Sequence, residues 1–267
     1  RLGTPLVASY HTNVTTYARF YGLGIGERAG RWWTRTLHNR ARINLCTSEA
    51  TRGYLLSEGI ERVHLWPQGV DARRFHPNHF SKDWRVRLSG GKPDDKLLLY
   101  VGRLAPEKGI GGLKAVLEEL PGFRLAVVGD GPARRDLEWE FADTPTVFTG
   151  VRKGRDLAAA YASADAFVFP STTETLGLSM LEALASGLPV VAARTGASAE
   201  VVSEGENGLL YEPDSPVSLV AAVRKLFSDE DYRSSLARQA RLSAEKRDWE
   251  NATRTLRGYY EQAVGAA

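Results

Sequence analysis

The sequence predicts an α/β protein built from two doubly wound parallel sheets, of which the N-terminal one is incomplete. Short apolar runs alternate with helical patterns along most of the chain, the order expected of parallel strands with helices on both faces. A polar stretch from 69 to 95, with prolines and a Gly-Gly pair, interrupts this alternation. After it the alternation restarts and continues through five or six strands, enough for a complete Rossmann-like sheet.

These observations divide the chain into four parts. We expect residues 1–78 to form the partial N-terminal domain and residues 79–95 to cross between the domains. Residues 96–248 then form the complete domain. Residues 249–267 form a helix with one apolar stripe, which we expect to pack back towards the N-terminal domain.

The individual elements follow from hydrophobic periodicity and from helix start and stop signals. Strands are predicted over 6–9, 43–46, 63–66, 97–101, 124–128, 146–148, 166–169, 189–192 and 209–210. Helices are predicted over 14–21, 30–40, 48–59, 176–185, 216–227, 230–247 and 249–264.

The composition is that of a globular protein, with 43% hydrophobic and 25% charged residues. No apolar run approaches the roughly 18 residues that a membrane-spanning helix needs. A net charge of +3 does not indicate a nucleic-acid partner. The single cysteine, Cys46, excludes an internal disulfide and lies in an apolar run, where a buried thiol is expected. Because Met180 is the only methionine and the first residue is Arg1, we expect that the chain does not begin at a translation start.

The segment FPSTTETLGLSMLEALASGLPVV, over 169–191, joins a strand to a helix and carries two carboxylates. Glu174 and Glu182 are eight positions apart, which corresponds to roughly 12 Å along a helix. That exceeds the separation of about 5 to 9.5 Å between the paired carboxylates of glycoside hydrolases. It suits two hydroxyl-rich groups on either side of an anion, held at the helix N-terminus formed by residues 176–179. A sugar, a diphosphate and a ribose have this shape. The alternative is an ordinary βαβ unit with two solvated glutamates.

Two loops follow strands at the same edge of the second sheet. The first, GRLAPEKG, begins at Gly102 and carries Arg103 and Lys108, whose side chains suit phosphate oxygens. The second, VGDGP, carries Gly129 and Gly131, which allow a ligand to approach the backbone closely. Either loop alone is a common turn. Their occurrence together with the two glutamates indicates a phosphate-bearing ligand at this edge.

These motifs, together with ADAFVFPSTTETLGLSMLEALASGLPVVAA and the tryptophan-led C-terminal helix, resemble those of the retaining nucleotide-sugar glycosyltransferases of the two-domain GT-B fold, the group 1 family. The likeness covers nearly the whole chain. The stretches SYHTNVTTYARFYG, GVDARRFHP and VFTGVRKGRDLAAAYASADAFVFPS are similar to the sulfoquinovosyldiacylglycerol synthases of plants and cyanobacteria and to lipid mannosyltransferases.

The resemblance implies transfer of a hexosyl group from a UDP- or GDP-linked sugar to a lipid acceptor such as diacylglycerol. Such a reaction would retain the sugar's stereochemistry, use no cofactor, and take place in the cytoplasm at the membrane surface. No metal is expected, because Arg103, Lys108 and the helix end supply the positive field. The acidic triplet at 229–231 lies between two helices, where such residues cap a helix start.

The resemblance also implies roles for individual residues, and we expect His11, Arg103, Lys108 and Glu174 to be catalytic. Arg103 and Lys108 would bind the diphosphate, while Glu174 holds the transferred sugar. His11 would lie across the cleft, near the sugar and the acceptor. The residues implied to form the donor site, with the backbone near Val151 and Arg152 at the nucleobase and Glu182 at the ribose, are Gly102, Arg103, Lys108, Gly129, Gly131, Val151, Arg152, Glu174, Thr175, Leu176, Gly177, Leu178 and Glu182.

A basic segment that carries two tryptophans extends from Arg28 to Arg42. It is either a solvated helix with Trp32 and Trp33 packed inward, or a surface that docks on anionic lipid with tryptophan at the headgroup level. A lipid acceptor favours the second interpretation.

Several alternatives share these motifs. One is a GDP-mannose-dependent α-mannosyltransferase for lipid or polysaccharide, and others are an epimerase or a pyridoxal-dependent phosphorylase on the same fold. A non-catalytic nucleotide-sugar-binding domain would need neither His11 nor Glu174. Because a full domain has about 100 to 200 residues, we expect a further N-terminal segment with a Gly-rich acceptor loop. The fragment alone is then expected to be weakly active or inactive.

Overall fold

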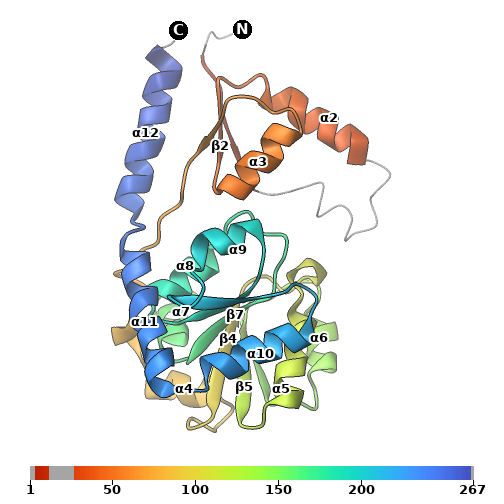
Figure 1. The fold of residues 1–267 in the computed structure, drawn as a ribbon, viewed down its shortest axis with the longest axis vertical. Coiled ribbons are helices and arrows are strands. Elements are labelled where there is room, and N and C mark those ends of the chain that lie inside the picture. The colour runs from red at the N-terminus through yellow and green to blue at the C-terminus, as the bar shows by residue number, and fades with distance from the viewer. Residues whose placement is uncertain (1–3, 12–26, 266–267) are drawn as a thin grey trace.

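The computed structural model describes residues 4–11 and 27–265, which form two units, each built around a parallel sheet (Figure 1). The smaller sheet has the strand order β1-β2-β3 and the larger one the order β6-β5-β4-β7-β8-β9. In the larger sheet the first strand in sequence lies in the centre and later strands extend to both sides. This is the doubly wound order of a Rossmann domain, as the sequence predicts.

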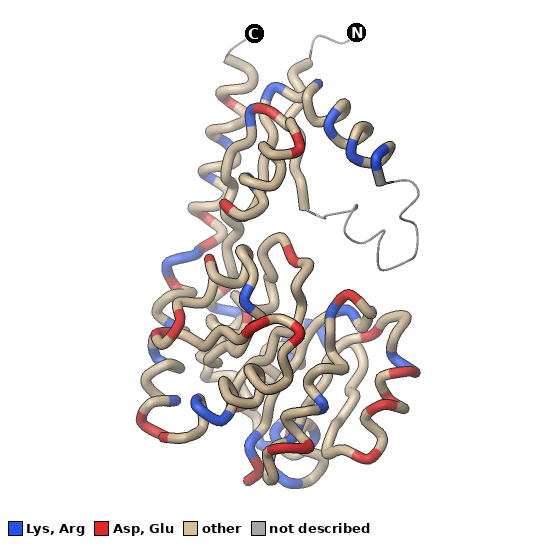
Figure 2. The backbone as a smooth tube through the Cα atoms, turned by 45° about the vertical axis from the view of Figure 1, so that its right-hand side comes forward, with Lys and Arg blue, Asp and Glu red and all other residues tan. Residues whose placement is uncertain are grey.

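The smaller unit contains β1 (Val7–Tyr10), β2 (Ile43–Cys46), β3 (Val63–Leu65), α2 (Glu27–His38) and α3 (Glu49–Ser57). α3 begins as predicted because the Ser48 side chain accepts a hydrogen bond from the N–H of Thr51. Cys46 is buried, and this burial raises the pKa of its thiol to about 11. Figure 2 shows basic residues along α2. The helix predicted over 14–21 lies outside the described residues.

The larger unit contains all six predicted strands, each within two residues of its expected bounds. These are β4 (Lys96–Val101), β5 (Phe123–Val128), β6 (Thr146–Gly150), β7 (Ala166–Phe169), β8 (Val190–Ala193) and β9 (Gly208–Tyr211). The helices around them are α4 (Lys82–Leu88), α5 (Lys114–Glu119), α6 (Arg134–Glu140), α7 (Gly154–Ala162), α8 (Leu178–Ala185), α9 (Gly196–Val201), α10 (Pro216–Leu226) and α11 (Glu230–Glu245), with 3₁₀ turns η2 (Pro77–His79), η3 (Pro106–Lys108) and η4 (Ile110–Leu113).

The larger sheet is buried on both faces. Leu97 and Leu99 of β4 belong to one hydrophobic core, and Leu98 and Tyr100 belong to the other. Successive side chains of a strand point to opposite faces, so each face carries its own layer of helices. The carboxyl ends of the strands are therefore the free edge at which a ligand can enter.

The segment 79–95, which we expected to cross between the domains, instead packs into the larger unit. It contains α4, whose Trp84 and Leu88 are buried in the same core as β4 and β7. Phe75 already belongs to that core, so the chain crosses from the smaller to the larger unit before Phe75. The polar composition concealed the helix, although Trp84 and Leu88 are spaced so that both lie on one helical face.

Two passages of the chain connect the units, and they touch each other. The backbone N–H of Val70 donates to the carbonyl of Arg247 (2.8 Å). A Cβ atom on Gly69 would lie 2.5 Å from the backbone of Asp248, so a larger residue does not fit without a shift of the chain. After this contact α12 (Trp249–Gly265) runs along the smaller sheet, where Trp66 Nε1 donates to the carbonyl of Ala252 (2.9 Å).

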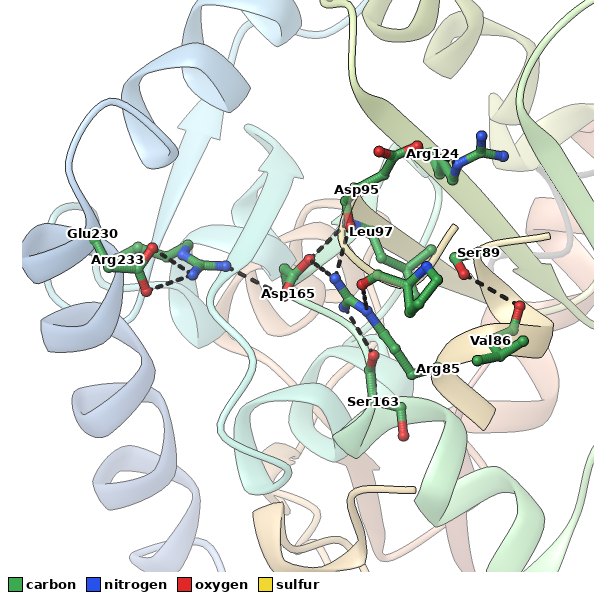
Figure 3. A network of polar contacts seen from close by, with 11 residues as sticks. Arg85, Val86, Ser89, Asp95, Leu97, Arg124, Ser163, Asp165, Glu230 and Arg233 are labelled. Atoms are coloured by element: carbon green, nitrogen blue, oxygen red, sulfur yellow. Dashed lines mark hydrogen bonds and ion pairs between the residues drawn. The ribbon is translucent and has the colours of Figure 1, made fainter. Parts of the chain in front are cut away.

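An ionic network ties the amino-terminal ends of β4 and β7 to α4 and α11 (Figure 3). Asp165, just before β7, accepts hydrogen bonds from Arg85 Nη2 (2.8 Å) and from the backbone N–H of Leu97 (2.7 Å). Arg233 of α11 approaches its other oxygen at 3.4 Å. This network lies at the edge opposite the carboxyl ends of the strands, so its role is stability.

Asp165→Ala is expected to lower the free energy of unfolding by about 2–4 kcal/mol, because it leaves Arg85 without its carboxylate and removes one of the two carboxylates that Arg233 contacts. The value is reduced from that of a fully buried pair because the Asp165 side chain is 21% exposed. Urea unfolding measures the change. Asp94→Ala, at an exposed position before β4, is the control and should change stability by less than about 0.5 kcal/mol. Equal stability of the two variants would contradict a structural role for the network.

Candidate active site

The candidate site lies where the strand order of the larger sheet reverses. β4 and β7 are neighbours, and the loops that follow them meet above their carboxyl ends. Lys108 Nζ donates to Glu174 Oε1 in an ion pair between these two loops. The loops are also close in the backbone, since a Cβ atom on Gly109 would lie 3.2 Å from the carbonyl oxygen of Pro170. Ligands of open α/β sheets bind at such a switch point.

The resemblance implies that Lys108 binds the diphosphate and that Glu174 binds the sugar. In the structure these two side chains form an ion pair with each other. The Lys108 side chain is largely buried and the Glu174 side chain is partly exposed. An ammonium group has three N–H donors, so Lys108 can bond Glu174 and a phosphate oxygen together. The pair thus brings together the carboxylate expected to bind the sugar and the cation expected to bind the phosphate.

Arg103 and the two glycines after β5 lie in loops that are bonded to each other. Arg103 is exposed, and its carbonyl accepts a hydrogen bond from the Tyr100 hydroxyl (3.0 Å). A Cβ atom on Gly129 would lie 1.9 Å from the Gly102 carbonyl oxygen, and one on Gly131 would lie 2.2 Å from that of Leu104. We expected these glycines to let a ligand approach the backbone closely. In the structure the backbone of the neighbouring loop, at Gly102 and Leu104, approaches them instead.

The helix after Glu174 begins at Leu178, two residues later than predicted. Gly177, with φ +83°, forms its N-cap in the left-handed region, and no capping side chain bonds the first turn. A side chain at Gly177 would meet Phe169 and Met180 within 3.0 Å. Leu176 is buried and contributes packing rather than a helical N–H group. The first-turn N–H groups of α8 therefore start at Leu178 and are suited to bind an anion.

Glu182, on α8, accepts a hydrogen bond from the hydroxyl of the buried Tyr161 (2.8 Å). Burial raises the pKa of Glu182, whereas the Tyr161 hydrogen bond and the charge of Arg74 lower it in part. The bond from Tyr161 occupies Oε2 and fixes the carboxylate. Neither Tyr161 nor Arg74 is predicted from the sequence to contact Glu182. Tyr161 lies within the apolar pattern of α7, and Arg74 lies in the segment that we expected to lead into the domain crossing.

The loop after β6, expected to face the nucleobase, turns its arginine inward. The Arg152 guanidinium lies 5.5 Å from the ring centroid of Trp84 and donates to the Thr149 carbonyl (2.5 Å). Val151 is exposed. The Arg152 side chain is thus engaged by Trp84 and Thr149, while the expected contact of this loop's backbone with a base stays a prediction.

The smaller unit contacts the Glu174 loop through Thr175. The Thr175 hydroxyl donates to the His11 carbonyl (3.0 Å), and the Thr47 hydroxyl donates to the Thr175 carbonyl (3.1 Å). The His11 ring is bonded within its own unit, to Ser9 Oγ (2.7 Å) and to Gln68 (3.4 Å). Beside these contacts lies a cavity of about 230 Å³, whose lining includes Glu174 and the hydroxyl-bearing residues Tyr10, Thr51, Tyr54, Thr172, Thr173, Thr175 and Thr195.

The acidic triplet at 229–231 caps α11, as predicted. Asp229 accepts a hydrogen bond from the N–H of Asp231 (3.0 Å). Within residues 4–11 and 27–265, no group of three or more His, Cys, Asp or Glu side chains is arranged to hold a metal. None of the helices in this part of the chain has the length and apolarity needed to cross a membrane.

Comparison with known families agrees with the arrangement of the two units. The family model for glycosyl transferases group 1 matches residues 83–243, and the model for glycosyltransferase family 4 matches residues 1–74. The chain belongs to the group 1 glycosyltransferases. The family inferred from the sequence motifs is thereby confirmed.

Relatives of both kinds indicated by the motifs are found among curated proteins. The chain is 41% identical over 270 residues to the sulfoquinovosyl transferase SQD2 of Arabidopsis thaliana, covering 98% of this chain and 53% of that protein. It is 39% identical over 266 residues to a GDP-mannose-dependent alpha-mannosyltransferase of Mycolicibacterium smegmatis, covering 99% of this chain and 68% of the other. The chain thus spans about half the length of the first relative.

Solved structures confirm the GT-B fold. Sucrose-phosphate synthase from Thermosynechococcus elongatus matches with a TM-score of 0.86 and 26% identity, over 98% of this chain and 68% of the other. HepE from Anabaena, in complex with UDP and glucose, matches with a TM-score of 0.83 and 23% identity, over 96% of this chain and 71% of the other.

Proposed function

We propose that this group 1 glycosyltransferase chain binds a UDP- or GDP-linked hexose and transfers the hexosyl group, with retention and without a metal, to a lipid of the diacylglycerol type. The observation that carries the proposal is the Lys108–Glu174 pair at the switch point of the larger sheet. An ammonium group suited to phosphate oxygens and a carboxylate suited to hydroxyl groups are in contact there, and this supports a sugar diphosphate as the ligand. The name of the GDP-mannose-dependent relative supports this class of donor, and the name of the sulfoquinovosyl transferase SQD2 supports glycosyl transfer.

The geometry suggests a division of roles. Lys108, Arg103 and the first turn of α8 stabilise the negative charge that develops on the departing diphosphate. Glu174 holds hydroxyls of the transferred sugar, and Glu182, fixed by Tyr161, holds those of the ribose. The bond between the sugar's anomeric carbon and the phosphate oxygen breaks on the face where the acceptor oxygen bonds. The departing phosphate oxygen takes the acceptor's proton.

A thermal-shift comparison of UDP-glucose and GDP-mannose tests the donor site. A ligand at 100 times its Kd should stabilise the fold by about 2.7 kcal/mol, so the preferred donor should raise Tm clearly above the other. Lys108→Ala should abolish that rise. Lys92→Ala, exposed at the opposite end of β4, should preserve it. A Tm unchanged by either nucleotide sugar would contradict the proposal.

Product analysis distinguishes the alternative functions that share this donor site. A preference for GDP-mannose would favour the α-mannosyltransferase alternative, which the Mycolicibacterium relative supports. Free UDP with an altered sugar, formed in the absence of an acceptor, would indicate an epimerase. Binding without turnover by the chain in its full natural length would indicate a regulatory nucleotide-sugar-binding protein.

We also propose that α2 docks on an anionic membrane surface, which would bring the cleft to a lipid acceptor. Trp32 and Trp33, which a solvated helix would pack inward, are 57% and 58% exposed. Arg28, Arg31 and Arg35 line a hollow beside Trp32. Exposed tryptophan next to arginine is typical of headgroup-level binding. Arg42 is not part of this face, because it donates to the carbonyl of Ala263 in α12 (2.8 Å).

Arg31→Glu combined with Arg35→Glu is expected to weaken binding to phosphatidylglycerol vesicles by at least about thirtyfold, since each basic residue contributes about 1 kcal/mol. Vesicle co-sedimentation at fixed salt measures the change. The matched control is Arg254→Glu with Arg257→Glu, which reverses two charges on the exposed face of α12. An equal loss in both double variants would show a non-specific charge effect and contradict docking through α2.

A further inference from the structure

The carboxylate of Glu200 caps a helix of the other unit. Glu200 lies on α9 of the larger unit. Its Oε2 accepts a hydrogen bond from the N–H of Glu49 (2.9 Å), and its Oε1 accepts one from the N–H of Ala50 (2.8 Å). These are the first two residues of α3, whose third N–H group is bonded by Ser48. Two of the N–H groups that a helix start leaves unbonded are therefore bonded by a side chain of the larger unit.

The contact between α9 and α3 is tightly fitted. A Cβ atom on Gly196, at the start of α9, would lie 2.4 Å from the Cβ of Ala50. A carboxylate also interacts favourably with the partial positive charge of a helix start. Both carboxylate oxygens of Glu200 are thus bonded to the backbone of α3.

The same turn of α3 bonds the loop that carries Glu174. Thr47, just before α3, donates to the carbonyl of Thr175 (3.1 Å), and Thr51 approaches the same oxygen at 3.5 Å. The cavity of about 230 Å³ lies between this turn and the Glu174 loop. The position of α3 therefore determines the width of the cleft beside Glu174.

Glu200 is also tied to the passage between the units. Arg247 Nη2 donates to the Glu200 carbonyl (2.6 Å), and the Arg247 carbonyl accepts the N–H of Val70 (2.8 Å). Glu200 thus links α9 to α3 through its side chain, and it links α9 to the chain that connects the units through its backbone carbonyl. A shift of α3 away from α9 would break only the first of these links.

We infer that Glu200 is a positioning residue for the transfer reaction. Its carboxylate holds the smaller unit against the larger one and thereby fixes the position of the acceptor side of the cleft relative to Glu174. The inference rests on the proposed function. Glu200 does not touch the residues proposed to hold the diphosphate, so its loss should leave donor binding intact and slow the transfer step.

The test compares Glu200→Ala and Glu200→Gln with Glu206→Ala, an exposed glutamate in the loop after α9. Amide hydrogen exchange at Glu49 and Ala50, donor Kd by titration, and kcat are measured, the last with the chain in its full natural length. Glu200→Ala should speed exchange at both amides by roughly tenfold, as expected for loss of a helix cap. It should lower kcat by about tenfold and leave donor Kd within about twofold. Glu200→Gln retains one acceptor oxygen and should be intermediate.

Each other result overturns part of the inference. Unchanged exchange at Glu49 and Ala50 in Glu200→Ala would show that Glu200 does not hold the smaller unit. Faster exchange with an unchanged kcat would exclude the positioning role. If kcat, donor affinity and the free energy of unfolding all fell together in Glu200→Ala, Glu200 would contribute only to the stability of the fold. If the unsubstituted protein bound no donor, the proposed function would fail, while the amide exchange would still decide whether Glu200 holds the smaller unit.

Discussion

Lys108→Ala is expected to lower the rate of glycosyl transfer by about a hundred- to a thousandfold, the usual effect of removing one donor to a developing anion. The substitution removes a largely buried cation from the switch point and leaves the partly buried Glu174 carboxylate without its partner. Both effects act on the donor site, so the donor Kd should rise together with the fall in kcat. Initial rates over a range of donor concentrations separate the two.

A double-mutant cycle with Glu174→Gln sharpens this prediction. Because Lys108 and Glu174 are in contact, the double variant should be less impaired than the product of the two single effects. Lys92→Ala is again the control. A loss below about tenfold for Lys108→Ala, or strictly multiplicative effects, would contradict the assignment of this pair to the active site.

Gly129→Ala is expected to prevent stable folding of the larger unit, at a cost above about 4 kcal/mol. The new Cβ atom would lie 1.9 Å from the Gly102 carbonyl oxygen, and Gly129 has φ +148°. The clash has no simple relief, because the N–H of Gly102 is bonded to the Val128 carbonyl (3.1 Å). Since natural domains are stable by only about 5–15 kcal/mol, we expect a low soluble yield and an early urea midpoint.

Gly112→Ala is the matched control for the backbone. A Cβ atom at Gly112 would have no neighbour within 4 Å. Alanine there should change the free energy of unfolding by less than about 1 kcal/mol, or stabilise the fold slightly. Equal urea midpoints for the two glycine variants would show that the loops after β4 and β5 can separate without cost.

The sequence predicted the strands and the location of the candidate site for physical reasons. Apolar runs such as 166–169 are bounded by turn residues, and parallel strands bring their following loops to one edge. The proximity of Lys108 and Glu174 follows once β4 and β7 are neighbours. The polar composition of 79–95 indicates a domain crossing, yet two apolar residues on one face of α4 are enough to bury this segment in the larger unit.

Other features depend on contacts that no local pattern encodes. The packing of the Arg152 guanidinium on the Trp84 ring is one of them, because the two residues are far apart in the sequence. Glu200 is separated from Glu49 by 151 positions, and in sequence it is one more polar residue of a short helix. Tyr161 is similarly hidden, because an aromatic residue in an apolar helix is usually core and only the fold brings its hydroxyl to Glu182.

The contact of Gly69 with Asp248 and Trp249 gives the molecule a pivot. The chain passes between the units twice, at Gly69 and at Asp248, and these two passages touch each other. A rotation of one unit against the other would therefore have its axis at this point. Hydrogen bonds from Trp66 to Ala252 and from Tyr259 to Leu65 fasten α12 to the smaller sheet, which makes the helix a lever arm that swings with that sheet. A small opening angle at the pivot is therefore magnified at the far end of α12, some seventeen residues away.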